Sequence, residues 1–382
     1  MRMPEAANDR MRKQVLDLKK VELHAHLFGS IRRATLIKLK ETAKKRAVTQ
    51  ADSTNNDAAN YLEQIQNCNR ESGSNSTQVA DLNSKFDSLD SAFQYFKLVY
   101  ELVDNSAIIS TILEEVLYDF HKDSVVYLEL RTTLKNIPQA DITHESYAAL
   151  LVAAIKKAES NYDMTVSFLL AVRLLLSIDR QKVIDEGSAQ KELDDVLRIA
   201  ELYNDYVVGI DIAGNPKKGN LLHLLPLIQS SILDPYSHFY RKLKVTIHTA
   251  EVENAEETNA ILLLLPHRLG HACFLTKEQR EFVCEHSIPV ELCPTSNVAM
   301  MELETIKDHH FGLYFYDQNY TSLCICTDDI GLFETSLTEE LLKIADAFQL
   351  SIKNLKDLQI ESMRAAFCQD TVKQKILKTH FT

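Results

Sequence analysis

The stretch VELHAHLFGS, residues 21–30, carries two histidines, His24 and His26, within an apolar run. In an extended strand, residues i and i+2 point to the same side, so both imidazoles would face one point. A single buried histidine can be satisfied by a backbone carbonyl, but two on one face each need a partner. A divalent metal would serve both. The stretch therefore predicts a buried strand that carries two metal ligands, with further ligands elsewhere in the chain.

Seven further runs rich in Val, Ile and Leu read as buried parallel strands. With the first run, they cover residues 20–27, 125–132, 164–172, 207–213, 243–249, 268–274, 288–293 and 323–327. Most of the later gaps hold amphipathic helical patterns, for example 182–205 and 253–265. Eight strands that alternate with helices predict a (β/α)8 TIM barrel. A doubly wound open sheet is the alternative, but no GxGxxG follows the first strand.

The interval between the first and second strands is much longer than the others. It contains a polar stretch rich in Asn and Ser, residues 47–85, which we expect to be a flexible insertion. Helical patterns precede it at 31–46 and follow it at 89–103 and 107–122. An insertion at this point would lie over the C-terminal mouth of a barrel, where a lid would sit. We expect residues 1–382 to form one barrel domain.

Composition limits the class of partner. The chain has 382 residues, 45% of them hydrophobic, and a net charge of -12, which argues against a nucleic acid polymer as partner. Seven cysteines without a CxxC pair indicate free thiols in a reducing compartment. The first residues lack the apolar core of a signal peptide, and no run approaches ~18 apolar residues. We expect a cytoplasmic protein without a membrane segment, and a monomer.

Barrel enzymes carry out their chemistry at the C-terminal ends of the strands. Polar residues gather at these ends in this chain: His24, His26, DIAGNP at 211–216, His248, Glu251, His271, CPTSN at 293–297, Asp328 and Asp329. Each has a simpler interpretation when taken alone. His248 or His271 could be a hydrogen-bonded structural residue, and Asp328 could cap the following helix.

Taken together, these residues predict a metal site. Three imidazoles, from His24, His26 and His248, and the Asp328 carboxylate suit one Zn²⁺ ion and leave a position for water. Hydrolysis also requires a proton donor and groups that orient the attacking water. Glu251 is placed to be a general acid, and His271 and Asp329 could hold the water and take its proton.

The motifs ELHAHL…GS, GIDIAGNP, IHTAE, RLGHACFL, ELCPTSN and ICTDD, in this order, resemble the adenosine and AMP deaminase superfamily. That family is a zinc-dependent (β/α)8 barrel that replaces the 6-amino group of a purine with oxygen. The resemblance implies that Glu251 protonates the purine ring nitrogen next to the reacting carbon. It also implies that the Gly214 N–H contacts the base, and that Asp329 accepts a hydrogen bond from the water or binds the purine.

Further details are similar to the N6-methyl-AMP deaminase subgroup, namely YLELRTTLK at 127–135, SIDR at 177–180 and CTDDIGLFETSLTEE at 326–340. The resemblance implies hydrolysis of N6-methyl-AMP to IMP and methylamine, and hydroxyls and a cation would suit the phosphate. It implies substrate contacts at His26, Phe28, Tyr100, Thr132, Thr133, Leu134, Lys135, Asp179, Gly214 and Asp329.

Five positions depart from the family pattern. Phe28 stands where the family has Asn or Asp, Tyr100 where the subgroup has His, Leu134 and Lys135 where it has Pro-Arg, and Ala272 where Gly is usual. Lysine would grip a phosphate as a point charge, whereas arginine can bind it through two hydrogen bonds. Adenosine deaminase activity is therefore a second candidate function. A purine-binding protein that has lost turnover and a different metal-dependent hydrolase barrel are two further hypotheses.

Overall fold

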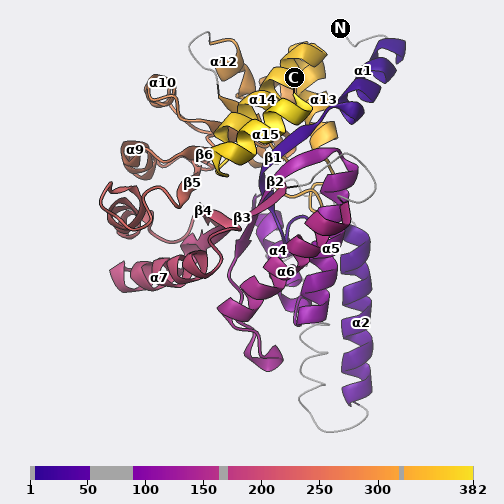
Figure 1. The fold of residues 1–382 in the computed structure, drawn as a ribbon, viewed down its shortest axis with the longest axis vertical. Helices are drawn as coiled ribbons and strands as arrows, with labels where there is room; N and C mark the ends of the chain where they lie inside the picture. Colours follow the sequence, from indigo (N-terminus) through magenta and orange to yellow (C-terminus); the bar gives the residue numbers. More distant parts are fainter. Residues whose placement is uncertain (1–4, 52–88, 163–170, 318–321, 382) are drawn as a thin grey trace, which may run out of the picture.

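The computed structural model describes residues 5–51, 89–162, 171–317 and 322–381. One eight-stranded sheet forms its centre, in the order β1 to β8, with every neighbouring pair parallel (Figure 1). The strands are β1 (Lys20–His26), β2 (Val125–Thr133), β3 (Ala171–Asp179), β4 (Val207–Ala213), β5 (Lys244–Thr249), β6 (Arg268–His271), β7 (Val290–Leu292) and β8 (Leu323–Ile325). The predicted (β/α)8 barrel is confirmed.

The barrel closes where β8 meets β1. One parallel bridge joins Ala25 to Asp328 at this seam. The His26 N–H donates to the Asp328 carbonyl at 2.9 Å, and the Asp328 N–H donates to the His24 carbonyl at 2.8 Å. Below the bridge, the buried Glu22 carboxylate accepts a hydrogen bond from the Thr327 N–H at 3.0 Å. A side chain thus supplies part of the hydrogen bonding at the seam.

Helices surround the strands, with α7, α9 and α10 on the left of Figure 1 and α13 to α15 at the top. The longer ones are α1 (Glu5–Asp17), α2 (Arg33–Ala51), α4 (Leu89–Leu102), α5 (Ser106–Lys122), α6 (His144–Tyr162), α7 (Glu186–Leu202), α9 (Ala255–Leu264), α10 (Lys277–Glu285), α13 (Leu337–Phe348), α14 (Ile352–Ala365) and α15 (Asp370–His380). Shorter helices are η1 (Pro138–Ala140), η2 (Arg180–Lys182), η3 (Leu221–His223), α8 (Leu225–Ile228), η4 (Gln229–Leu233), α11 (Pro294–Met300), η5 (Ile306–Asp308) and α12 (Phe311–Phe315). Helices outside and packed side chains inside explain why the strands are almost wholly buried.

Most strand boundaries differ from the sequence prediction by one or two residues, and those of the third and sixth strands differ more. Residues 164–170 of the predicted third strand, 164–172, lie outside the described residues, and its predicted end is wrong, because β3 continues through Asp179 in register with β2 and β4. Apolar residues continue almost without a break from 168 to 178, so composition did not mark where the strand ends. The predicted sixth strand extended to residue 274, but β6 ends at His271, where the backbone turns to φ 58° at His271 and φ 53° at Ala272.

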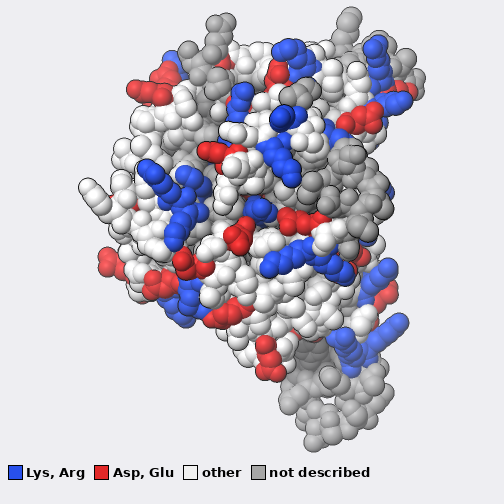
Figure 2. Space-filling view, in the orientation of Figure 1, with Lys and Arg blue, Asp and Glu red and all other residues white. Residues whose placement is uncertain are grey.

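The interval between β1 and β2 contains α2, α4 and α5, as the helical patterns predict. Of the predicted flexible stretch 47–85, residues 47–51 continue α2, and the remainder lies outside the described residues. On the face in Figure 2, lysine and arginine alternate with aspartate and glutamate and do not gather into one basic surface. No helix within the described residues has the length and apolar character needed to cross a membrane.

Candidate active site

The four predicted metal ligands meet at the mouth of the barrel. His24 and His26 end β1, His248 lies on β5, and Asp328 follows β8. The His26 and His248 Nε2 atoms are 3.1 Å apart, and Asp328 Oδ1 lies 3.5 Å from His24 Nε2 and 3.4 Å from His26 Nε2. Two ligands held at about 2.0–2.1 Å from one tetrahedral zinc ion lie about 3.3 Å from each other. The spacing of these atoms therefore fits a single ion.

The outer nitrogens of two of these histidines contact buried carboxylates. His24 Nδ1 lies 2.7 Å from the Glu291 carboxylate, and His248 Nδ1 lies 3.1 Å from Asp211. A carboxylate only accepts, so each Nδ1 carries a proton and each Nε2 lone pair faces the site. His24 Nε2 is buried without a hydrogen-bond partner in the described structure, as expected of a metal-ligating nitrogen.

A guanidinium connects these two carboxylates. Arg131, on β2, contacts Asp211 Oδ1 at 3.0 Å and also contacts Glu291, and all three side chains are fully buried. Arg268 contacts Glu291 at 2.5 Å from the other side. The arginine charges hold the pKa of Glu291 well below its usual value despite its burial. Arg131, Asp211 and Glu291 were not among the site residues predicted from the sequence, although charged residues within apolar strands were a signal for them.

A second group of possible ligands shares two residues with the first. His24, His271, Cys293 and Asp328 also have ligand atoms within 4.8 Å of one another. In this group His271 would bind through Nε2, but its Nδ1 lies 3.0 Å from the Asn297 amide nitrogen. Because an amide NH₂ only donates, the proton of a neutral His271 belongs on Nε2, where it blocks metal binding. The hydrogen bonds therefore favour the group with His26 and His248.

Glu291→Gln tests the importance of the buried carboxylate behind His24. We expect zinc affinity to fall about 10–100-fold, because the neutral amide orients and polarises the imidazole less well. Loss of the negative charge also leaves Arg131 and Arg268 partly uncompensated, so the protein should be less stable. Competition with a chromophoric chelator measures the affinity, with the exposed Glu285→Gln as control. An unchanged affinity would contradict this account of Glu291.

The predicted proton-transfer residues lie beside the ligands. Glu251 Oε1 is 3.8 Å from His271 Nε2, which lies 4.0 Å from Asp328 Oδ2. Burial raises the pKa of the Glu251 carboxyl to about 7, and the Asp328 charge adds to this effect although His248 opposes it. Burial and the charges of Asp328 and Glu251 raise the pKa of Asp329 well above its usual value. Two carboxyls that favour the protonated form thus face the same space.

Two glycines permit close approaches at this site. Gly214 has φ 106°, and a Cβ at this position would lie 2.4 Å from Asp179 Oδ1. A Cβ on Gly29 would lie 1.6 Å from Asp329 Oδ1. Any side chain would displace these two carboxylates.

Two of the residues that depart from the family pattern, Phe28 and Tyr100, lie around a third, Lys135. The Lys135 Nζ lies 3.3 Å from the centre of the Tyr100 ring and 4.8 Å from that of Phe28. The two rings meet edge to face, 5.8 Å apart. Burial and the nearby Lys182 charge lower the pKa of Lys135 to about 7, although Asp179 opposes them. Two aromatic faces thus contact this ammonium.

The other predicted contacts on β2 divide between its two sides. Arg131 points into the barrel, and Thr133 shares its side by the alternation of the strand. The Thr132 hydroxyl instead lies 2.6 Å from the Tyr147 hydroxyl on α6, and Leu134 belongs to the hydrophobic core. The structure therefore brings Lys135 to the aromatic rings but turns Thr132 and Leu134 toward the helices.

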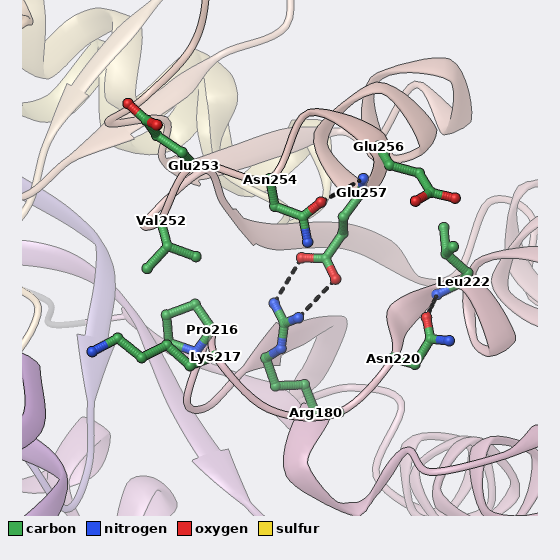
Figure 3. A pocket seen from close by; sticks show the side chains of 11 residues that line it. Arg180, Pro216, Lys217, Asn220, Leu222, Val252, Glu253, Asn254, Glu256 and Glu257 are labelled. Atoms are coloured by element: carbon green, nitrogen blue, oxygen red, sulfur yellow. Dashed lines mark hydrogen bonds and ion pairs between the residues drawn. The ribbon is translucent and has the colours of Figure 1, made fainter.

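A cavity of about 380 Å³ opens beside this region, between the loops that follow β3, β4 and β5 (Figure 3). Arg180 faces Glu257 there through two hydrogen bonds, at 2.9 and 2.7 Å. Its Nε donates to the Lys218 carbonyl at 2.8 Å. With these interactions Arg180 joins the loops to each other, and its charge is compensated by Glu257.

Comparison with known proteins agrees with this geometry. The adenosine deaminase family model matches residues 19–380. An N6-mAMP deaminase of Arabidopsis thaliana is 32% identical, over 95% of this chain and 96% of that protein. The N6-methyl-AMP deaminase of Homo sapiens is 29% identical, over 95% and 92%. The crystal structure of arabidopsis ADAL complexed with IMP superposes with a TM-score of 0.77, at 32% identity over 95% of this chain and 96% of that one.

A metal-dependent hydrolase barrel is the class of protein that this fold and donor set define. The chain belongs to the adenosine deaminase family.

Proposed function

We propose that this protein hydrolyses N6-methyl-AMP to IMP and methylamine, with one zinc ion held by His24, His26, His248 and Asp328. The convergence of these four residues beside Glu251 carries the proposal. Relatives over nearly the whole chain are named N6-methyl-AMP deaminases, and one solved relative holds IMP. A zinc ion supplies the Lewis acidity that makes a water molecule nucleophilic near neutral pH.

The chain's own residues supply the remaining chemistry. Protonated Glu251 donates to the ring nitrogen next to the reacting carbon, which makes that carbon electrophilic, and its raised pKa suits this role. His271 and Asp329 orient the attacking water on the reacting face. The Gly214 N–H holds the base, and Lys135 and Thr133 meet the phosphate. The six described cysteines are free thiols, which agrees with a cytosolic location; a monomeric state stays a prediction.

Adenosine deaminase activity is the second candidate, and one observation favours it. Phe28 is 4% exposed and offers no hydrogen bond where the family has Asn or Asp. Its ring, like that of Tyr100, already contacts the Lys135 ammonium. A pocket with this lining could accept an uncharged ribose in place of a phosphate.

A turnover assay of N6-methyl-AMP, AMP, adenosine and N6-methyladenosine separates the two candidates. We expect N6-methyl-AMP to react fastest and Lys135→Gln to raise its KM about 10–100-fold, because a charge-assisted hydrogen bond contributes about 1.5–3 kcal/mol. The variant should leave any nucleoside turnover unchanged. The exposed Lys217→Gln is the matched control, with no expected effect. Preference of the wild-type protein for adenosine would replace the first candidate with the second.

A further inference from the structure

The ring of His271 lies at the end of a directional chain of hydrogen bonds that starts at a backbone amide. The Phe311 N–H donates to His309 Nδ1 at 2.9 Å. His309 therefore carries its proton on Nε2 as a neutral ring, and Nε2 lies 3.2 Å from Asn297 Oδ1. All of these side chains are buried, so water does not compete for these bonds.

The orientation of the Asn297 side-chain amide determines which His271 nitrogen accepts a hydrogen bond. Its Oδ1 also accepts a hydrogen bond from the Cys293 N–H at 3.0 Å, and a backbone N–H cannot accept. The orientation of the amide is thus set by two donors. Its Nδ2 must donate, and it lies 3.0 Å from His271 Nδ1. With Nδ1 as acceptor, the neutral His271 ring holds its proton on Nε2, which faces the site.

The backbone of His271 is fixed as well. His271 and Ala272 both have left-handed backbone angles, φ 58° and φ 53°, which are unfavourable for residues with a side chain. His310 Nε2 donates to the His271 carbonyl at 2.8 Å. The adjacent residues His309 and His310 thus secure the ring and the main chain of His271 from one segment.

We infer that Asn297 and His309 are positioning residues that keep the His271 proton on Nε2, so that His271 donates a hydrogen bond to the attacking water. This inference rests on the proposed function. It revises the role that sequence analysis predicted for His271, since an Nε2 that already bears hydrogen has no lone pair to take a proton. Activity then depends on the direction of the Asn297–His271 hydrogen bond as well as on its presence.

Asn297→Asp and Asn297→Ser in the zinc-loaded enzyme test this direction. Aspartate has nearly the same shape and still accepts from Cys293 and His309, but it can only accept from His271, which reverses the tautomer. Serine is smaller but can donate. We expect Asn297→Asp to lower kcat about 10²–10⁴-fold with little change in KM or melting temperature, and Asn297→Ser to retain more activity. A purely structural role would give the opposite order.

Two further measurements complete the test. Asn254→Asp, which adds the same charge near the mouth at the exposed N-cap of α9, should leave kcat unchanged. ¹⁵N NMR of the histidine-labelled, zinc-loaded wild-type protein, with His271 assigned by its loss in His271→Gln, should show hydrogen on Nε2 only. Hydrogen on Nδ1 would overturn the inference. Because this readout needs no substrate, it stands even if N6-methyl-AMP is not turned over.

Discussion

Glu251→Gln lowers kcat for N6-methyl-AMP about 10²–10⁴-fold in our expectation, while zinc binding persists. The amide nearly matches the carboxyl in shape, but it has no acidic proton to give to the purine ring. Glu251 is 6% exposed, so bulk water cannot readily replace it as the donor. Steady-state kinetics with metal analysis of each preparation measures the effect.

The control and the pH dependence sharpen this test. Glu253→Gln, two residues further along the same loop and exposed at the cavity in Figure 3, should leave turnover unchanged. Because the pKa of Glu251 is raised to about 7, the acid form required for catalysis is lost as pH rises through this value. The wild-type kcat/KM should therefore fall about tenfold per pH unit above about pH 7. A Glu251→Gln enzyme with the wild-type rate would remove Glu251 from the reaction.

Removal of the metal should lower turnover at least as much as Glu251→Gln does. Dialysis against a strong chelator is expected to abolish turnover, and one equivalent of Zn²⁺ should restore it, because the four ligands converge on one position. The metal-free protein should also be less stable, by about 2.7 kcal/mol relative to protein in zinc at a hundred times the dissociation constant. Calorimetric unfolding with and without zinc measures this difference.

Variants locate the metal. Asp328→Ala should bind zinc far more weakly, whereas His238→Gln, at an exposed histidine away from the mouth, should still bind one equivalent. Full activity after chelation, or a requirement for two equivalents, would contradict a single-zinc site.

The local pattern of apolar residues predicted those strands whose ends are determined by the residues of the strand itself. The limits of β4 were predicted at Val207–Ala213, and the paired histidines on β1 face one point as the two-residue period requires. The end of β3 depends on register with β2, and the end of β6 depends on two left-handed residues. Neither is encoded in a window of neighbouring residues.

The site residues likewise divide into those that the local sequence predicts and those that depend on tertiary contacts. Its ligands follow from strand ends and the chemistry of zinc, but the link from Arg131 to both Asp211 and Glu291 joins three strands that are far apart in sequence. Phe28 and Tyr100 looked like lost polar contacts, and only the structure shows their rings around Lys135. Contacts of this kind depend on tertiary packing and cannot be read from the order of residues.

The seam between β1 and β8 has a consequence for the order of folding. His24 and His26 lie near one end of the chain and Asp328 near the other, and one backbone bridge joins them. Closing so long a loop carries a large entropy cost, and contacts of such high contact order form late. We therefore expect the ligand set to be completed late in barrel assembly. Metal uptake should mark the end of folding, and the bound ion should slow unfolding by holding the two edges together.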